Sequence, residues 1–286
     1  MENVYTIKEK FFTAERVKRA FFLLPGIVFA LFQLFPLIWL FNFSLVSSSE
    51  LFGSSILVWP SEFRWENYQI AWVDGKIIQY LMNSLIVNIV TVLLTIFLSF
   101  MMAYAFTRMK WKLKNKFLLF IMLGIMIPIH ATLVPNFISF DYLGIKDSYL
   151  ALILPYTAFS IPQAVFIYTG YLSSVPLALE EAAVLDGCSL PQAIFRIVFP
   201  IVKAPTMTVA IMTFLSTWNE YIMAATYLSS DSYRTLPFSV QNFVGQYSSN
   251  YSAQFAVMFL SSLPAIIVYI VLNDKITKGA AMGAVK

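Results

Sequence analysis

Residues 180–200 read EEAAVLDGCSLPQAIFRIVFP and form the least membrane-like part of a very apolar chain. Pro176, just upstream, suits the first turn of a helix, where the missing N–H of proline would have no partner. The residues that follow predict a short helix over 177–186. Gly187 then stands where the end of a helix favours a residue with left-handed backbone.

A second short helix is expected to begin at once. Ser189 and Gln192 have the spacing of a capping box, in which two side chains bond the first free backbone N–H groups. Pro200 ends this helix or opens the next one. One shallow face of the first helix is formed by residues at i, i+3, i+4 and i+7: Leu179, Ala182, Ala183 and Asp186. The stretch thus predicts a sharply bent helical pair whose small side chains suit docking against another surface.

The composition places the whole chain in a membrane. Hydrophobic residues make up 59% of it and charged residues 12%, with a mean hydropathy of +0.74, whereas soluble domains carry about 25% charged residues. We therefore expect an all-α, polytopic membrane protein. One cysteine, Cys188, excludes an intrachain disulfide, and one His with one Cys cannot build a metal cluster. The sequence lacks a Walker A pattern, so any ATP and Mg must be bound by another chain.

Six apolar runs predict six transmembrane helices. The first is expected to kink at Pro25 and Pro36, the third to break at Pro128 and Pro135, and the fourth contains Pro155 and Pro162. The predicted spans are 20–46, 80–107, 117–137, 149–172, 205–228 and 252–272. Three parts follow: a cytoplasmic N-terminal segment (1–19), a six-helix domain (20–272) that includes the 173–200 loop, and a C-terminal tail (273–286). The tail is either disordered or in contact with a partner.

The basic residues orient these spans. An even number of spans puts both termini on one side, and fifteen of the nineteen Lys and Arg lie on that side, five of them in the short loop 108–116. Basic loops stay in the cytoplasm. We therefore expect a multi-pass protein of the plasma or inner membrane, with both termini and the 173–200 loop cytoplasmic. The same basic run could bind nucleic acid only as part of a domain, and none fits here.

The loop also carries a family pattern. Glu181-Ala182-Ala183 is followed after three residues by Gly187, and after nine more by Ile197, one residue and Phe199-Pro200. This spacing resembles the EAA loop of import permeases of ATP-binding-cassette (ABC) transporters, with Phe199 in place of the family's leucine. Asp186 before the glycine is similar to the carbohydrate-permease branch. The resemblance extends to FRWENYQIAW (63–72), AYAF (103–106), MIPIHATLVP (126–135) and LGIKDSYLALILPY (143–156).

This resemblance implies a type I importer permease that acts as half of a sugar translocation pathway. Its implied partners are a second homologous permease, two cytosolic ABC ATPases that bind ATP and Mg, an extracytoplasmic solute-binding protein and membrane lipid. The chain itself would not be an enzyme. The resemblance also implies that the chain is coupled to the ATPases through Glu180, Glu181, Ala182, Ala183, Asp186 and Gly187.

A second group of residues is a candidate substrate path. Trp218-Asn219-Glu220-Tyr221 resembles an element of carbohydrate permeases, and Glu220 is the only acidic residue placed inside a predicted span. A charge there is costly unless it faces a cavity or a partner. With a rise of 1.5 Å per residue, Glu220 and Asn88 fall about 12 Å, and His130 about 10 Å, inside the membrane. These residues either form a polar rim for sugar hydroxyls, or Glu220 holds neighbouring helices together.

Two other functions compete with the importer permease. A self-sufficient secondary transporter or channel would be expected to show internal repeats and several intramembrane ionisable residues. The sequence shows no duplicated half and offers only Glu220 and His130. An intramembrane enzyme needs a catalytic pair or a metal site, and no such pair stands out.

Overall fold

The structure is a computed structural model. It describes the backbone of residues 2–51, 58–244 and 250–284, and the side chains of residues 21, 23–51, 58–244 and 250–271. This described part is helical and forms no β-sheet. The long helices are α1 (Glu2–Ser44), α4 (Ile77–Arg108), α7 (Leu150–Leu172), α11 (Lys203–Trp218) and α13 (Tyr251–Ala284).

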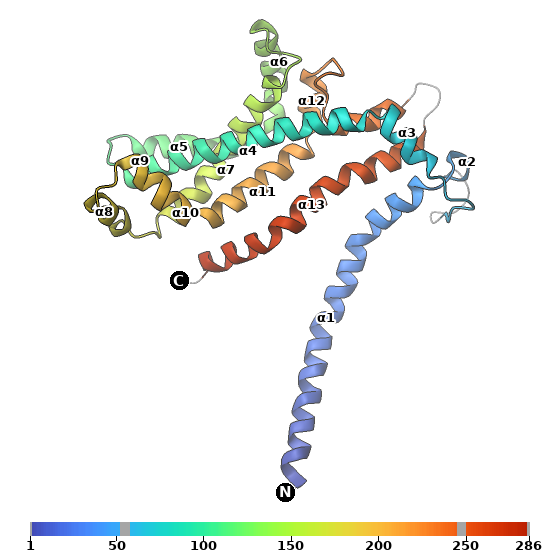
Figure 1. Cartoon of the computed structure of the whole chain (residues 1–286), viewed down its shortest axis with the longest axis horizontal. Helices are drawn as coiled ribbons and strands as arrows, with labels where there is room; N and C mark the ends of the chain where they lie inside the picture. Colours follow the sequence, from blue (N-terminus) through green and yellow to red (C-terminus); the bar gives the residue numbers. More distant parts are fainter. Residues whose placement is uncertain (1, 52–57, 245–249, 285–286) are drawn as a thin grey trace.

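Shorter helices fill the connections between the long ones. They are α2 (Ser48–Leu51), α3 (Glu66–Asp74), α5 (Lys114–Leu123), η1 (Gly124–Met126), η2 (Ile129–Thr132), α6 (Leu133–Tyr142), α8 (Ala178–Leu185), α9 (Leu190–Gln192), η3 (Ala193–Val198, a π-helix), α10 (Phe199–Ile201), α12 (Ile222–Tyr227) and η4 (Leu236–Phe243). α8 and α9 lie at one end of the bundle, and α2 and α3 lie at the opposite end (Figure 1).

Four helices run side by side and form the bundle: α4, α7, α11 and α13 (Figure 1). α4 and α7 have the most extensive contact. The face that α4 buries is lined by small or polar side chains, each at most 2% exposed: Ser84, Asn88, Thr91, Thr95, Ser99 and Ala103. Small side chains let two membrane helices approach closely. This stripe therefore explains the close packing of α4 against its neighbours.

The first helix leaves the bundle. The C-terminal end of α1 contacts α13, and the rest of α1 runs away from the other helices (Figure 1). Its span, Leu23–Ser44, has a mean hydropathy of 2.1, and none of its most apolar window is buried within the chain. The helical backbone is continuous from Glu2, so the predicted boundary at residue 20 is not marked by a break. At the other terminus, the backbone of the predicted tail continues α13 to Ala284.

By length and composition, the described residues contain four continuous helices that could span a membrane, or up to six spans if each of two bent pairs is one span. Segments 114–126 and 129–142 meet at 94°. The break falls at Ile127 and Pro128, both with extended backbone, as the proline there predicts. Pro135 was also expected to break this span, and that expectation is wrong because Pro135 lies in the first turn of α6, where proline is tolerated.

The fifth span differs from its prediction. A continuous helix over 205–228 was expected, but α11 ends at Trp218. Residues 219–221 interrupt the helix, and α12 is a separate short helix. Glu220 therefore lies in a break and not inside a continuous helix. At its other end, α11 forms the second bent pair with 190–201, at 75° around Val202.

Candidate functional site

Most of the predicted 173–200 loop is formed by two capped helical segments within residues 177–201, which are called the 177–201 loop from here on. α8 ends in a Schellman motif: Cys188 N donates to Ala183 O at 2.9 Å, and Gly187 N donates to Val184 O at 3.0 Å. Gly187 has φ +89°, the left-handed backbone that its position predicts. Nothing lies within 4 Å of where a Cβ would stand on Gly187. The restriction at this position is thus backbone strain and not lack of space within the chain.

The second helix begins with the predicted capping box. Ser189 N donates to Gln192 Oε1 at 2.8 Å, and the Ser189 side chain caps the N3 backbone. The helix continues through the π-turn of η3, a geometry frequent at functional sites. Both caps are local, so the bend between α8 and α9 is fixed by residues close together in sequence.

The inward side of α8 is tied to α4 by a buried ion pair. Arg108 Nε lies 2.7 Å from Glu180 Oε1, and the side chains are 10% and 8% exposed. Tyr104 Oη donates to Glu180 Oε2 at 2.8 Å, and an Arg108 terminal nitrogen donates to Val175 O at 2.8 Å. Sequence reasoning missed this role of Arg108, which was counted only as a basic loop residue. The i, i+4 spacing of Tyr104 and Arg108 was the available signal.

The predicted coupling residues therefore divide into two groups. Glu180 and Ala183 are 6% and 7% exposed and face the bundle, so the expected shallow docking face is not exposed as a whole. Glu181, Ala182, Asp186 and Gly187 are exposed. Beside them Val184 and Leu185 are 53% and 89% exposed. A groove of about 480 Å³ separates α8 from α9 and is lined by Tyr104, Glu180, Glu181, Val184, Leu185, Leu190 and Ala193.

Glu220 lies at the break between α11 and α12 and bonds in two directions. Its Oε1 accepts from Met223 N at 2.7 Å, so the carboxylate caps the start of α12. Its Oε2 accepts from Tyr156 Oη of α7 at 2.5 Å and from Ala224 N at 3.3 Å. An anionic cap is favourable at the N-terminus of a helix. This arrangement corresponds to the alternative in which Glu220 holds neighbouring helices together.

The same carboxylate also borders a cavity. A volume of about 290 Å³ lies where the bent span 114–142 passes α7 and α11. It is lined by Gly124, Ile125, Ile127, Ile129, Tyr156, Phe159, Ser160, Gln163, Ser216, Thr217 and Glu220. Hydroxyl, amide and aromatic groups mix in this lining, and Glu220 is its single formally charged residue. The cavity is close to the lower limit for small-molecule sites.

The other predicted path residues do not all reach this cavity. Asn88 is buried and accepts a hydrogen bond from Thr217, a lining residue. His130 is exposed next to the lining residue Ile129. The other three residues of the Trp-Asn-Glu-Tyr element contact groups outside the cavity lining: Trp218, Asn219 and Tyr221.

Trp218 is 4% exposed, stacks on Phe214 and donates to Ser261 O at 3.3 Å. Asn219 is exposed and donates to Leu215 O of its own helix at 2.9 Å. Tyr221 packs edge-on against Phe238. Glu220 thus lines the cavity directly, and Asn88 is linked to it through Thr217. Trp218, Asn219 and Tyr221 lie outside the cavity lining.

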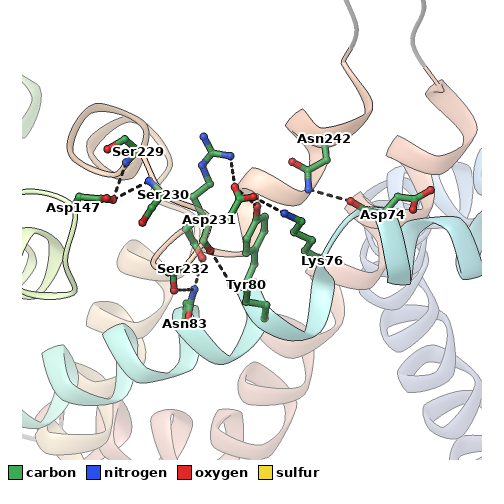
Figure 2. Close-up of polar contacts among 12 residues, drawn as sticks. Asp74, Lys76, Tyr80, Asn83, Asp147, Ser229, Ser230, Asp231, Ser232 and Asn242 are labelled. Atoms are coloured by element: carbon green, nitrogen blue, oxygen red, sulfur yellow. Dashed lines mark hydrogen bonds and ion pairs between the residues drawn. The ribbon is translucent and has the colours of Figure 1, made fainter.

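A polar network closes the end of the bundle opposite α8. Figure 2 shows Asp231 between Lys76 and Tyr80, at the start of α4, and Asn83 pointing to the backbone of Ser232. Arg234 also pairs with Asp231. The hydrogen bond from Lys76, followed by that from Tyr80, holds the pKa of Asp231 below its usual value. The network fixes the segment after α12 on the start of α4.

Asp147 fixes the same segment from the other side. Its carboxylate accepts from Ser229 N and Ser230 N at 2.9 and 3.0 Å (Figure 2). Burial alone would raise the pKa of Asp147, but the backbone and side-chain hydrogen bonds of Ser230 and Ser229 lower it overall. Residues 228–236 are thereby held between α4 and the turn that precedes α7.

The fold occurs in a solved structure. The chain is similar to a chain of a solved structure titled as a bacterial ABC transporter involved in the import of the acidic polysaccharide alginate. The TM-score is 0.76 at 22% identity, and the match covers 91% of this chain and 97% of that chain. The two chains thus share a fold.

Residues 95–280 match the family described as binding-protein-dependent transport system inner membrane component, and the chain belongs to this family. A protein of Caldicellulosiruptor sp. strain Rt8B.4 named as an ABC transporter permease is 37% identical, over 88% of this chain and 91% of its own. The sulfoquinovosyl glycerol transport system permease protein of Agrobacterium fabrum is 31% identical, over 88% and 89%. The chain is a multi-pass ABC permease subunit, and these likenesses give no support to a self-sufficient transporter or channel.

Proposed function

We propose that this subunit forms half of the pathway of an ABC importer for a carbohydrate, and that its 177–201 loop docks on a cytosolic ATPase. The observation that carries this proposal is the loop itself. Its bend is fixed by two caps, its inner side is locked to α4, and its outer side exposes Glu181, Val184 and Leu185 at one end of the bundle. A rigid element with exposed apolar side chains suits a protein interface.

The orientation follows from charge. The 108–116 loop and the 177–201 loop share one end of the bundle, since Arg108 contacts Glu180, and the positive-inside rule places that end in the cytoplasm. ATP and Mg would then bind to the docked ATPases, of which we propose two. The opposite end, closed by the Asp231 network, would receive an extracytoplasmic solute-binding protein.

A second permease is the proposed neighbour of the lateral surface. α1 is apolar over Leu23–Ser44 but leaves the bundle, and large side chains such as Phe21, Phe32 and Leu24 are 73%, 73% and 66% exposed. Lipid covers part of such a surface. The remainder suits a homologous subunit, because half of a pathway needs a second half.

The proposed substrate is a carbohydrate for two reasons. The relative from Agrobacterium fabrum is named for a glycoside transport system. The 290 Å³ cavity offers Ser160, Gln163, Ser216 and the Phe159 ring, groups that bond hydroxyls or stack on sugar faces. We expect a neutral sugar, because Glu220 puts a negative charge in the lining. Among the predicted path residues, Glu220 and Asn88 would then support this cavity.

The test is purification of the tagged chain from its own membranes in mild detergent, followed by mass spectrometry and uptake into proteoliposomes. We expect an ATPase, a second permease and ATP-dependent uptake of neutral sugars. Glu181→Lys should release the ATPase, whereas the same charge change at exposed Glu62, at the opposite end, should retain it. A chain that purifies alone and transports without ATP would contradict the proposal, and uptake of sulfonated glycosides alone would contradict the neutral-sugar assignment.

A further inference from the structure

Arg108 is the last residue of α4, and its guanidinium contacts two separate segments. Nε faces the Glu180 carboxylate of α8 at 2.7 Å, and a terminal nitrogen donates to Val175 O, in the turn after α7, at 2.8 Å. The contact with Glu180 is an ion pair and not a well-aligned hydrogen bond. One side chain therefore joins α4, the α7–α8 turn and α8.

The carboxylate is equally committed. Glu180 Oε1 meets Arg108, and Oε2 accepts from Tyr104 Oη, one turn earlier on α4. The whole Glu180 residue is 6% exposed and Tyr104 is 3% exposed. The next charged residues, Glu181 in α8 and Lys110 just after the end of α4, are exposed instead. Each of the two segments thus turns one charge inward and the next one outward.

A buried ion pair of this kind adds little net stability, but separating its partners leaves uncompensated charge away from water. α8 and the end of α4 are consequently hard to move apart. α4 is the helix that packs most extensively against α7 and also contacts α11. A displacement of α8 would therefore move α4, together with the helices packed against it, and would not be absorbed by the loop.

We infer that Arg108 and Glu180 form a joint that transmits movement of α8 to α4. Arg108 is then a positioning residue for coupling and not only a basic residue that orients the membrane spans. Glu180, which is 6% exposed and pairs with Arg108, acts through Arg108. The inference rests on the proposed docking of an ATPase on the outer side of α8.

A charge swap tests the joint in the assembled importer. The variants are Arg108→Glu, Glu180→Arg and the two combined, with Lys110→Glu, close to Arg108, as the control. Glu181→Arg, on the proposed docking surface, is a separate variant that is expected to release the ATPase. The readouts are ATPase retention and sugar uptake per ATP hydrolysed in proteoliposomes. We expect each single reversal at the joint to lower uptake per ATP about tenfold, and the double variant to restore a large part of it. A purely structural role would reduce the amount of complex without changing uptake per ATP in the complex that forms.

The conservative variants Arg108→Lys and Glu180→Gln cover the case in which the reversals prevent assembly. Lysine keeps the charge but lacks the planar guanidinium, with which Arg108 contacts Glu180 and Val175 O from two different nitrogens, so we expect an intermediate loss of uptake per ATP. Normal uptake per ATP in both conservative variants, or in either single reversal, would overturn the joint. Absence of an ATPase from the unmodified complex would instead overturn the proposed docking, and the Glu181→Arg variant reports on docking separately.

Discussion

Arg108 Nε, at the end of α4, lies 2.7 Å from Glu180 Oε1 in α8, with both side chains at most 10% exposed. This contact makes the 177–201 loop part of the bundle. Of the two adjacent glutamates, Glu180 is the buried one and Glu181 the exposed one. A charge reversal at Glu180 is therefore expected to disturb the contact of α8 with α4, whereas a reversal at Glu181 is expected to weaken the docking of the ATPase.

The backbone of Gly187 gives a prediction with a matched control. Gly187→Ala adds one methyl group at φ +89°, and Gly170→Ala adds the same group inside α7; neither Cβ would meet an atom within 4 Å. We expect about 1 kcal/mol of strain at Gly187 and none at Gly170. ATPase retention should fall only in the first variant. Equal retention in both variants would mean that the Schellman turn is not needed for docking.

Glu220 is expected to act as a bracket between α7 and α12. Glu220→Gln keeps the shape but removes the charge that accepts from Tyr156 Oη and Met223 N. Hydrogen bonds to charged groups contribute about 1.5–3 kcal/mol, so the variant should lower the thermal stability of the purified permease. Tyr156→Phe removes one donor without touching the charge.

A double-mutant cycle separates the two roles of Glu220. If the bracket is correct, the losses of stability in Glu220→Gln and Tyr156→Phe should be less than additive, because both remove one interaction. A raised KM for sugar with unchanged stability would place Glu220 in the substrate path instead. Both changes together would mean that the bracket shapes the 290 Å³ cavity.

The Asp231 network gives a prediction for pH. In the folded protein the pKa of Asp231 lies below its ordinary value, chiefly because of the hydrogen bond from Lys76. The stabilisation is therefore present above the ordinary pKa of about 3.9 and lost as the pH falls through the lower, folded pKa. Asp231→Asn should lower the melting temperature at pH 7, and the difference from the unmodified chain should shrink below pH 4.

Asp74→Asn is the control for that measurement. Asp74 is exposed at the same end of the bundle, and it contributes its backbone oxygen, not its carboxylate, to the bond with Asn242 (Figure 2). Its melting temperature should follow the unmodified chain at every pH. A pH-independent difference in Asp231→Asn would show that the network does not depend on the charge of Asp231.

Local signals in the sequence predicted the loop well. The helix end at Gly187 and the capping box from Ser189 to Gln192 depend on residues only a few positions apart. Hydropathy predicted the apolar spans because it also depends only on residues close together in sequence. The break at 219–221 carries no Pro or Gly to signal it, and it is stabilised by Tyr156, a residue of another helix.

The side on which each charge lies could not be predicted in the same way. Glu180 and Glu181 are chemically identical neighbours, and only the packing of α8 against α4 decides which one meets Arg108. Trp218 and Asn219 were placed in the substrate path by their motif, yet one turns to Ser261 and the other to its own helix. Pairing across helices depends on tertiary packing, which spacing along one helix does not contain.

Cys188, the single cysteine of this chain, lies partly exposed at the turn between α8 and α9, and its alkylation tests the central claim most directly. A membrane-impermeant maleimide should label it in inside-out vesicles and not in right-side-out vesicles, with Cys188→Ser as the control. Stripping the ATPase from inside-out vesicles should increase the labelling. Labelling from the outer side, or labelling unchanged by removal of the ATPase, would contradict a cytoplasmic loop that docks the ATPase.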